Sequence, residues 1–395
     1  MADTPFEQPW PPEQPWFTVD GNRMKLLDTG PRRLEALIAL IDGAETSLRI
    51  LFYIYTDDVA GRRVRDAMVA ARKRGVSVSV IVDGFGSEVA GDESFFRPLT
   101  DIGGEVCRFL PRFGRSYLLR NHQKLALADE ARVITGGFNV EDDYFGTPAE
   151  AAWRDLGIQI EGPAAGRIAG YFDALSKWAK LEKAKIRDLR TLLKRSSETQ
   201  GTVRWLLAGP TRRLSPWAQT MRTDMRAAKR IDMIAAYFAP GPGLLRRMDR
   251  AGKRGGDVRL ITAAISDNTA TIAAARFTYR GLLKNGAEIF EFLPTKLHTK
   301  LYVIDDIVHI GSANFDMRSL FINLEIMVRI EDAAFAGHVR GYFEGEMAKS
   351  EAITVEINRA RSGLWTRIKQ FGAYLLIAVL DYNLSRRLNF GIDGR

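Results

Sequence analysis

Residues 120–139 read R-N-H-Q-K-L-A-L-A-D-E-A-R-V-I-T-G-G-F-N, and residues 297–314 repeat the pattern as L-H-T-K-L-Y-V-I-D-D-I-V-H-I-G-S-A-N. Each copy has a histidine, a lysine two residues later, an aspartate five residues after the lysine, and a small pair shortly before an asparagine. These positions are His122, Lys124, Asp129 and Asn139 in the first copy, and His298, Lys300, Asp305 and Asn314 in the second. The chain has only four histidines, so two matching copies of this spacing are not a chance pattern.

Each copy has the pattern of a β-hairpin. Side chains two residues apart share a face of a β-strand, so we expect the histidine and lysine of each copy to lie on a strand and point the same way. Asp129 and Asp305 fall in the turn after each strand. The small pair before each asparagine lets the backbone approach a ligand closely. Each copy is therefore predicted to place an imidazole, an ammonium and an amide around one point, which suits a phosphodiester.

The surrounding chain alternates strands with helices, which predicts sheets flanked by helices and an α/β fold. In the first half we expect helices at 34–41, 62–74 and 94–103, and strands at 47–55, 76–82 and 105–109. The second half repeats this order, with a helix and a strand within 225–238, a helix at 244–252, and strands at 258–262 and 287–292. This internal duplication is too long for a solenoid repeat and indicates two similar domains that face each other.

The paired motif resembles the phospholipase D superfamily, and the surrounding sequence resembles its bacterial cardiolipin synthase branch over about residues 20–350. R-N-H-Q-K together with G-G-F-N is similar to the synthase branch rather than to the nucleases of the superfamily. The resemblance implies two phospholipase D-type domains, each a mixed β-sheet flanked by helices, with the active site at their interface. In one departure the first copy has Gly137 where the second has Ser312, so any hydroxyl contribution is one-sided.

The resemblance also implies roles for individual residues. The expected catalytic set is His122, Lys124, Asp129, His298, Lys300 and Asp305, although the two aspartates are also placed to brace their hairpins. We expect Asn139, Asn314 and Ser312 to bind substrate. Asp155 and Glu325 stand at the head of matching later strands, where the superfamily places carboxylates that orient the histidines. Which carboxylate orients which histidine is left open.

These residue types suit phosphodiester chemistry. One imidazole can attack phosphorus while the other, protonated, delivers a proton to the leaving alcohol. Lysine and asparagine side chains can hold the non-bridging oxygens. By resemblance the reaction forms a covalent phosphatidyl-histidine, with His122 attacking and His298 acting as the general acid. We expect no cofactor and no metal, because His309 and His338 are isolated and no H-x-x-x-H or carboxylate triplet occurs.

We divide the chain into an extended Pro/Trp-rich segment (1–21), a first phospholipase D-like domain with a basic helical linker (22–200), a second such domain (201–350), and an amphipathic tail (351–395). The basic stretch at 177–195 is either a solvated face or a contact with anionic lipid. The apolar run 371–380 is shorter than the roughly 20 residues that span a bilayer. With its flanks Arg367, Lys369, Arg386 and Arg387, it predicts a helix in the membrane interface. The alternative is a helix packed on the second domain.

The composition of the chain limits the kinds of partner it can bind. A chain of 395 residues, 46% of them hydrophobic, is long enough for two cores, and its net charge of +9 favours an anionic partner. The single cysteine, Cys107, excludes an internal disulfide framework, and the first residues lack the features of a signal peptide. We therefore expect a peripheral protein on the cytoplasmic side of the cell membrane. Its expected partner is an anionic phospholipid, phosphatidylglycerol, and not nucleic acid, and its two halves form a pseudo-dimer within a monomer.

Three alternatives to a cardiolipin synthase are open at this point. Water as the acceptor would make the same chemistry a phospholipase D that releases phosphatidic acid. An endonuclease of the same superfamily also fits a basic chain with paired histidines, but the sequence has no interleaved basic and aromatic stripe for stacking bases. A scaffold without activity would have little reason to keep both motifs whole.

Overall fold

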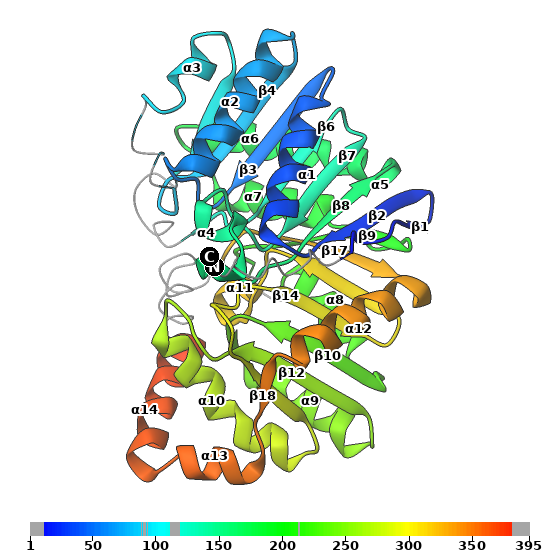
Figure 1. Cartoon of the computed structure of the whole chain (residues 1–395), viewed down its shortest axis with the longest axis vertical. Coiled ribbons are helices and arrows are strands. Elements are labelled where there is room, and N and C mark those ends of the chain that lie inside the picture. The colour runs from blue at the N-terminus through cyan, green and yellow to red at the C-terminus, as the bar shows by residue number, and fades with distance from the viewer. Residues whose placement is uncertain are drawn as a thin grey trace, which may run out of the picture.

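The computed structural model describes residues 12–380, except 88, 90, 91, 93, 111–118, 212 and 213. The chain forms two lobes, which lie one above the other in Figure 1. The strands of the first lobe are β1 (Phe17–Val19), β2 (Asn22–Leu27), β3 (Ser47–Phe52), β4 (Ser77–Asp83), β5 (Glu105–Phe109), β6 (Leu125–Ala128), β7 (Arg132–Gly136) and β8 (Gly157–Glu161). They form one sheet in the order β1-β2-β8-β7-β6-β3-β4-β5.

The second lobe repeats this sheet. Its strands are β9 (Val203–Ala208), β10 (Arg230–Ala235), β12 (Asp257–Ala263), β13 (Glu288–Phe292), β14 (Lys300–Ile304), β15 (Ile307–Gly311), β17 (Glu325–Glu331) and β18 (Ser350–Ala352), in the order β18-β13-β12-β10-β14-β15-β17-β9. A separate parallel pair is formed by β11 (Phe238–Ala239) and β16 (Phe315–Asp316). In both large sheets three parallel strands adjoin an antiparallel set that begins with the motif hairpin. The mixed α/β fold of two similar domains is therefore confirmed.

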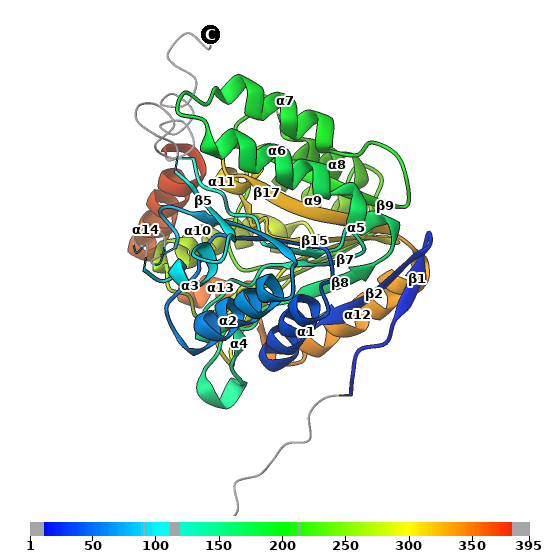
Figure 2. The same cartoon turned by 90° about the horizontal axis from the view of Figure 1, so that it is seen from above.

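Helices cover the sheets. In the first lobe they are α1 (Gly30–Asp42), α2 (Val59–Lys73), α3 (Arg97–Thr100), α4 (Asp142–Phe145), the 3₁₀ turn η2 (Pro148–Glu150), α5 (Pro163–Arg167), α6 (Ala169–Lys180) and α7 (Ile186–Ser196). In the second lobe they are α8 (Pro216–Asp224), α9 (Pro242–Lys253), α10 (Thr269–Lys284), α11 (Met317–Phe321), α12 (Ala333–Met347), α13 (Val355–Arg361), α14 (Leu364–Tyr374) and the π-helical η3 (Leu375–Leu380). Figure 2 shows α6 and α7 on one side of the strands and α1 and α2 on the other.

One hydrophobic core joins the lobes. It includes inward side chains of both sheets together with those of α5, α6, α7 and α12. Two further cores lie beneath the outer helices, one under α1 and α2 and one under α8, α9 and α10. β15 packs against β7 and β8, so the two motif hairpins meet at the lobe interface. The shared core therefore fixes the two motifs relative to each other.

Three helix predictions differ from the structure. The basic stretch 177–195 is two helices, α6 and α7, because the chain leaves helical geometry at Leu181. The predicted helix 94–103 shrinks to the four residues of α3. The helix expected from Met225 lies earlier, as α8, where Pro216 follows the N-cap Ser215, whose side chain accepts a hydrogen bond from Ala218 N. Met225 is the residue that ends that helix.

The described parts of both terminal segments pack against the two lobes. Trp16 lies under Arg23 and Lys25, and Phe17 packs edge-on against Phe335 with ring centroids 5.5 Å apart. In the tail, α14 packs one face on α10, which is the arrangement left open as the alternative to a helix in the membrane interface. Arg386 and Arg387 lie outside the described residues. No helix in the described part of the chain is both long and apolar enough to span a membrane.

Candidate active site

The two motif histidines lie just outside their strands. His122 and Lys124 precede β6, while His298 precedes β14 and Lys300 begins it. The expectation that each histidine lies on a strand is therefore wrong, because these short segments pair with the opposite lobe instead. Within each motif the lysine ammonium donates a hydrogen bond to the carbonyl oxygen of its own histidine, at 2.6 Å in the first copy and 2.5 Å in the second.

Backbone pairing between the lobes positions both motifs. His122 N donates to Leu324 O at 2.9 Å, one residue before Glu325. In the second copy, His298 N donates to Arg154 O at 2.7 Å, one residue before Asp155. Each segment forms an isolated parallel bridge with the other lobe. The strand-leading carboxylate of each lobe is therefore placed beside the histidine of the other.

The side chains complete this crossed arrangement. His122 Nδ1 lies 2.9 Å from Glu325 Oε2, and His298 Nδ1 lies 2.6 Å from Asp155 Oδ2. Both carboxylates are fully buried, and the histidines are only 9% and 4% exposed. A carboxylate at Nδ1 fixes the ring and leaves Nε2 for chemistry. The structure thus brings His122, His298, Asp155 and Glu325 together and pairs each histidine with a carboxylate from the opposite half.

The site is a buried cluster of cationic groups. Burial, together with Lys124 and Lys300, holds the pKa of His122 well below its usual range. Burial and Lys300 lower the pKa of His298 to about 3. Burial also lowers the pKa of Lys124 strongly and that of Lys300 to about 8. Lysines of both motifs act on each histidine, so the two copies form one site, and an incoming anion would compensate its charges.

The two carboxylates are held in different states. Burial tends to raise the pKa of Asp155, but His298 and Lys300 outweigh it and leave the pKa below its usual value. Burial raises the pKa of Glu325 to about 8, against the opposing effect of Lys124. The duplicated site is therefore electrostatically asymmetric: the partner of His298 is an ionised carboxylate at neutral pH, whereas the partner of His122 retains its proton more readily.

The small pairs contribute to this asymmetry. Ser312 Oγ donates to Glu325 Oε2 at 2.5 Å, and Ser319 Oγ donates to Glu325 Oε1 at 2.8 Å. At the matching position, a Cβ added to Gly137 would lie 2.3 Å from Asp155 Oδ1. Gly137 thus makes room for a carboxylate rather than for a ligand as we expected, and the Ser312 hydroxyl contacts a carboxylate as well.

The two asparagines also differ. Asn139 Oδ1 accepts a hydrogen bond from Ile54 N at 3.1 Å, so its amide braces the end of β3. Asn314 is buried in the matching place, but its Oδ1 has no hydrogen-bond partner in the described part of the chain. Buried polar atoms are normally satisfied. An amide oxygen only accepts, so Asn314 Oδ1 is open to a donor such as a substrate hydroxyl.

Asp129 and Asp305 lie at the opposite ends of the motif strands from the histidines, in turns with φ of 54° and 48°. Asp129 accepts hydrogen bonds from the amides of Glu45, Thr46 and Ser47, the residues that lead into β3. Although burial opposes it, these donors hold the pKa of Asp129 well below its usual range. Asp305 accepts from the amides that lead into β10. The geometry gives both aspartates a bracing position.

Several residues around the site carry no sequence signal that we used. The ring of Tyr53 lies 4.9 Å from that of His122, and the rings of Tyr144, Trp153 and Tyr237 lie 5.2, 5.4 and 6.4 Å from that of His298. Arg33, buried on α1, donates to the backbone oxygens of Asp155 and Tyr144. Arg33 shares the buried face of α1 with Leu37 and Leu40, so helical periodicity was a signal that could have placed it in the core. Among the described residues, no three His, Cys, Asp or Glu side chains gather as a metal site would require.

Comparison with known proteins agrees with this geometry. The family described as "Cardiolipin synthase, PLD-like domain" matches residues 37–175 and 222–347. Cardiolipin synthase 1 of Bacillus anthracis is 30% identical over 87% of this chain and 70% of its own length. The major cardiolipin synthase ClsA of Bacillus subtilis is 31% identical over 92% of this chain and 76% of its own.

A solved structure shows the same fold at much lower identity. The phosphatidylserine synthase of Haemophilus influenzae superposes with a TM-score of 0.70 at 12% identity, covering 95% of this chain and 97% of that one. The family match covers most of the chain and includes both histidine motifs. The chain therefore belongs to the phospholipase D superfamily, in its cardiolipin synthase branch of phosphatidyltransferase enzymes.

Proposed function

We propose that this enzyme makes cardiolipin from two molecules of phosphatidylglycerol through a phosphatidyl-histidine intermediate. The observation that carries the proposal is the crossed pairing of His122 with Glu325 and of His298 with Asp155 in one buried site. The similarity to cardiolipin synthases at about 30% identity supports the choice of substrate.

In the first half-reaction, Nε2 of His122 attacks the phosphorus of phosphatidylglycerol. The bond between phosphorus and the oxygen of the terminal glycerol breaks, and His298 gives that oxygen its proton, so free glycerol leaves. Lys124 and Lys300 lie where they can neutralise the non-bridging oxygens. Asn314, whose unpartnered amide oxygen can accept a hydrogen bond from a glycerol hydroxyl, is the substrate-facing asparagine, and Ser312 acts through Glu325.

In the second half-reaction, the glycerol hydroxyl of another phosphatidylglycerol attacks phosphorus. Its proton passes to His298, the bond between phosphorus and His122 breaks, and cardiolipin leaves. The enzyme returns to its starting protonation state. The low exposure of both histidines favours a lipid alcohol over bulk water as the acceptor.

The asymmetry of the carboxylates supports this order of roles. A nucleophilic imidazole needs a free lone pair at Nε2, so the proton of His122 must sit on Nδ1, which faces Glu325, and the strongly lowered pKa of His122 keeps the ring uncharged. A general acid must become an imidazolium when the substrate anion arrives, and the ionised Asp155 at 2.6 Å from His298 stabilises that state. Asp129 and Asp305 are assigned a structural role. The enzyme acts as a peripheral protein on the cytoplasmic face of the membrane and as a monomer.

Product analysis tests the proposal. Purified enzyme is incubated with phosphatidylglycerol vesicles and the lipid and water-soluble products are separated. Cardiolipin and free glycerol in equal amounts are expected. Phosphatidic acid with glycerol would identify a phospholipase D, and cleavage of DNA without lipid turnover would identify a nuclease; either result contradicts the proposal.

A further inference from the structure

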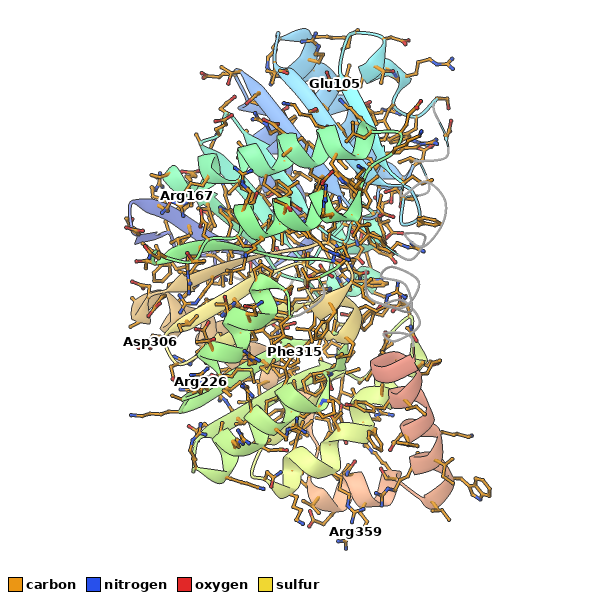
Figure 3. All side chains as sticks on the ribbon, turned by 180° about the vertical axis from the view of Figure 1, so that it is seen from behind. Glu105, Arg167, Arg226, Asp306, Phe315 and Arg359 are labelled. Carbon is orange, nitrogen blue, oxygen red and sulfur yellow. The ribbon has the colours of Figure 1, made fainter. Side chains whose placement is uncertain are left out.

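A second basic pocket has no motif residue in its wall. It lies between α10, α13 and α14 and has a volume of about 160 Å³. Arginines from all three helices line it: Arg276 and Arg280 on α10, Arg359 on α13, and Arg367 on α14. Arg359 lies at the outer edge of the second lobe (Figure 3). The pocket is therefore a separate concentration of positive charge at the surface.

Most of this charge is not neutralised by the protein. Arg276 forms a two-point pair with Glu291, at 2.8 and 2.7 Å. The other three arginines have no ion-pair partner in the described part of the chain. The three helices together contain seven basic residues and one acidic residue, Glu356. Guanidinium groups clustered in this way match the oxygens of a phosphate.

A buried amide also faces the pocket. Gln370 of α14 lines it and is only 7% exposed. An amide nitrogen in the pocket wall can donate a hydrogen bond to a phosphate oxygen. The Ser362 side chain in the same wall adds a second neutral donor.

Beside the pocket, α14 exposes a row of apolar side chains. Leu364 and Trp365 are 75% and 77% exposed, Ile368 and Phe371 continue the row at helical spacing, and Leu376 extends it onto η3. We call these five residues the α14 stripe. The opposite face of the helix is anchored, because Tyr374 donates a hydrogen bond to Pro240 O at 2.9 Å and packs on Phe277. The stripe therefore lies on a fixed support, and Phe371 at its inner edge also contacts Phe277, with ring centroids 5.5 Å apart.

We propose that the pocket and the α14 stripe together dock the enzyme on a membrane through one anionic phospholipid. Its phosphate lies among Arg280, Arg359, Arg367 and Gln370, while the stripe enters the boundary between headgroups and acyl chains. The occupant we infer is a lipid, because a free phosphate would leave the five apolar side chains exposed to water, whereas a bilayer would cover them. This inference concerns binding and does not depend on which reaction the histidines catalyse.

Docking at this place would hold α11 and Glu325 of the second lobe in a fixed orientation to the bilayer. α14 continues into η3, which contacts α11. Ser319 of α11 donates to Glu325, the partner of His122. The docked lipid is therefore a fixed contact that orients the site, distinct from the lipid that reacts.

Vesicle co-sedimentation of the full chain tests the proposal. Wild-type protein is mixed with vesicles of phosphatidylcholine alone or with half phosphatidylglycerol, in about 0.1 M salt. We expect R280Q/R367Q to weaken binding to the anionic vesicles about tenfold or more, and R280K/R367K to bind like the wild type. W365S/I368S should weaken binding to a similar extent through the stripe. The matched control, R63Q/K73Q on α2, removes two exposed charges of the first lobe and should change binding less than twofold.

The same variants exclude other readings. Hydrolysis of a soluble phosphodiester should remain at the wild-type rate in all of them, which checks folding without using a membrane. Equal binding by R280Q/R367Q and wild type would overturn the proposal, as would equal losses in R280Q/R367Q and R63Q/K73Q. Release of the protein from vesicles by millimolar glycerol phosphate at constant ionic strength would assign the pocket to a soluble phosphate and also overturn it.

Discussion

In one half of the site a histidine meets an ionised aspartate, and in the other half a histidine meets a glutamate that tends to keep its proton. His298 lies 2.6 Å from Asp155, in a setting of three aromatic rings. His122 lies 2.9 Å from Glu325, which also accepts hydrogen bonds from Ser312 and Ser319. The duplicated backbones are alike, so the difference comes from a few side chains.

The two copies of a duplicated fold can take different catalytic roles. Because the carboxylates cross between the lobes, each histidine depends on both halves of the chain. Substitution of one carboxylate should therefore affect the histidine of the other lobe rather than the histidine of its own lobe. From this asymmetry we assign attack to His122 and proton transfer to His298.

Removal of the crossed partners should give the largest effects. We expect H122A and E325Q to lose the first half-reaction, H122A by about 10⁴-fold or more. H298A and D155N should retain it with a nitrophenyl phosphodiester, because that leaving group needs no proton. The burst of nitrophenol in rapid-mixing experiments provides the measurement. If D155N instead behaved like H122A, the carboxylates would act within their own halves and the crossed account would be wrong.

Substitution of the two motif lysines should lower the rate by a smaller factor, and by a different factor in each copy. Loss of one donor to a phosphoryl oxygen typically lowers the rate by about 10²–10³. Burial lowers the pKa of Lys300 to about 8 but lowers that of Lys124 further, so Lys300 carries more of the charge at pH 7. We therefore expect K300M to reduce kcat/KM more than K124M. An equal or reversed order at pH 7 would contradict this difference.

The pH dependence should reflect the same groups. In the free enzyme Lys300 and Glu325 both have a pKa of about 8. Above that pH the lysine becomes neutral and the glutamate becomes negative, and both changes weaken binding of an anionic substrate. We expect kcat/KM to fall about tenfold per pH unit above pH 8, with a shallower fall in K300M, which lacks the titrating lysine. A profile that is flat to pH 10 would count against these assignments.

The serine that distinguishes the copies should have the smallest effect. S312G makes the second small pair like the first, and it removes a donor to Glu325 and an acceptor for Ile326 N. We expect kcat to fall by about tenfold or less, since one hydrogen bond to a carboxylate is lost. S176A, which alters a buried serine on α6, is the matched control and should keep full activity. A loss as large as that of E325Q would mean that Ser312 has a direct catalytic role.

Local chemistry made much of this predictable from the sequence. The positions of Asp129 and Asp305 predicted tight turns, and in the structure both aspartates have a positive, left-handed φ. The alternation of apolar strands with helices predicted the main elements of each lobe in their order along the chain, because the strands are buried and apolar. The helices that were misplaced, such as the one from Met225, were set by a cap and a proline that the apolar pattern obscured.

The pairing at the site could not be predicted in this way. It depends on contacts between segments 203 and 143 residues apart, as in His122 with Glu325 and His298 with Asp155. No local pattern marks such a crossing, since either carboxylate could serve either histidine. The aromatic rings around His298 were missed for the same reason: Tyr144 on α4, Trp153 after η2 and Tyr237 between β10 and β11 share no spacing with the motif.

The central claim is that His122 is the nucleophile, and the covalent intermediate tests it directly. Enzyme is incubated with phosphatidylglycerol labelled with ³²P, quenched before transfer, and digested at alkaline pH so that phosphohistidine survives. The account predicts the label on the peptide that contains His122, with greater accumulation in H298A. A label on the peptide that contains His298 in the wild-type enzyme would contradict the account and reverse the two roles.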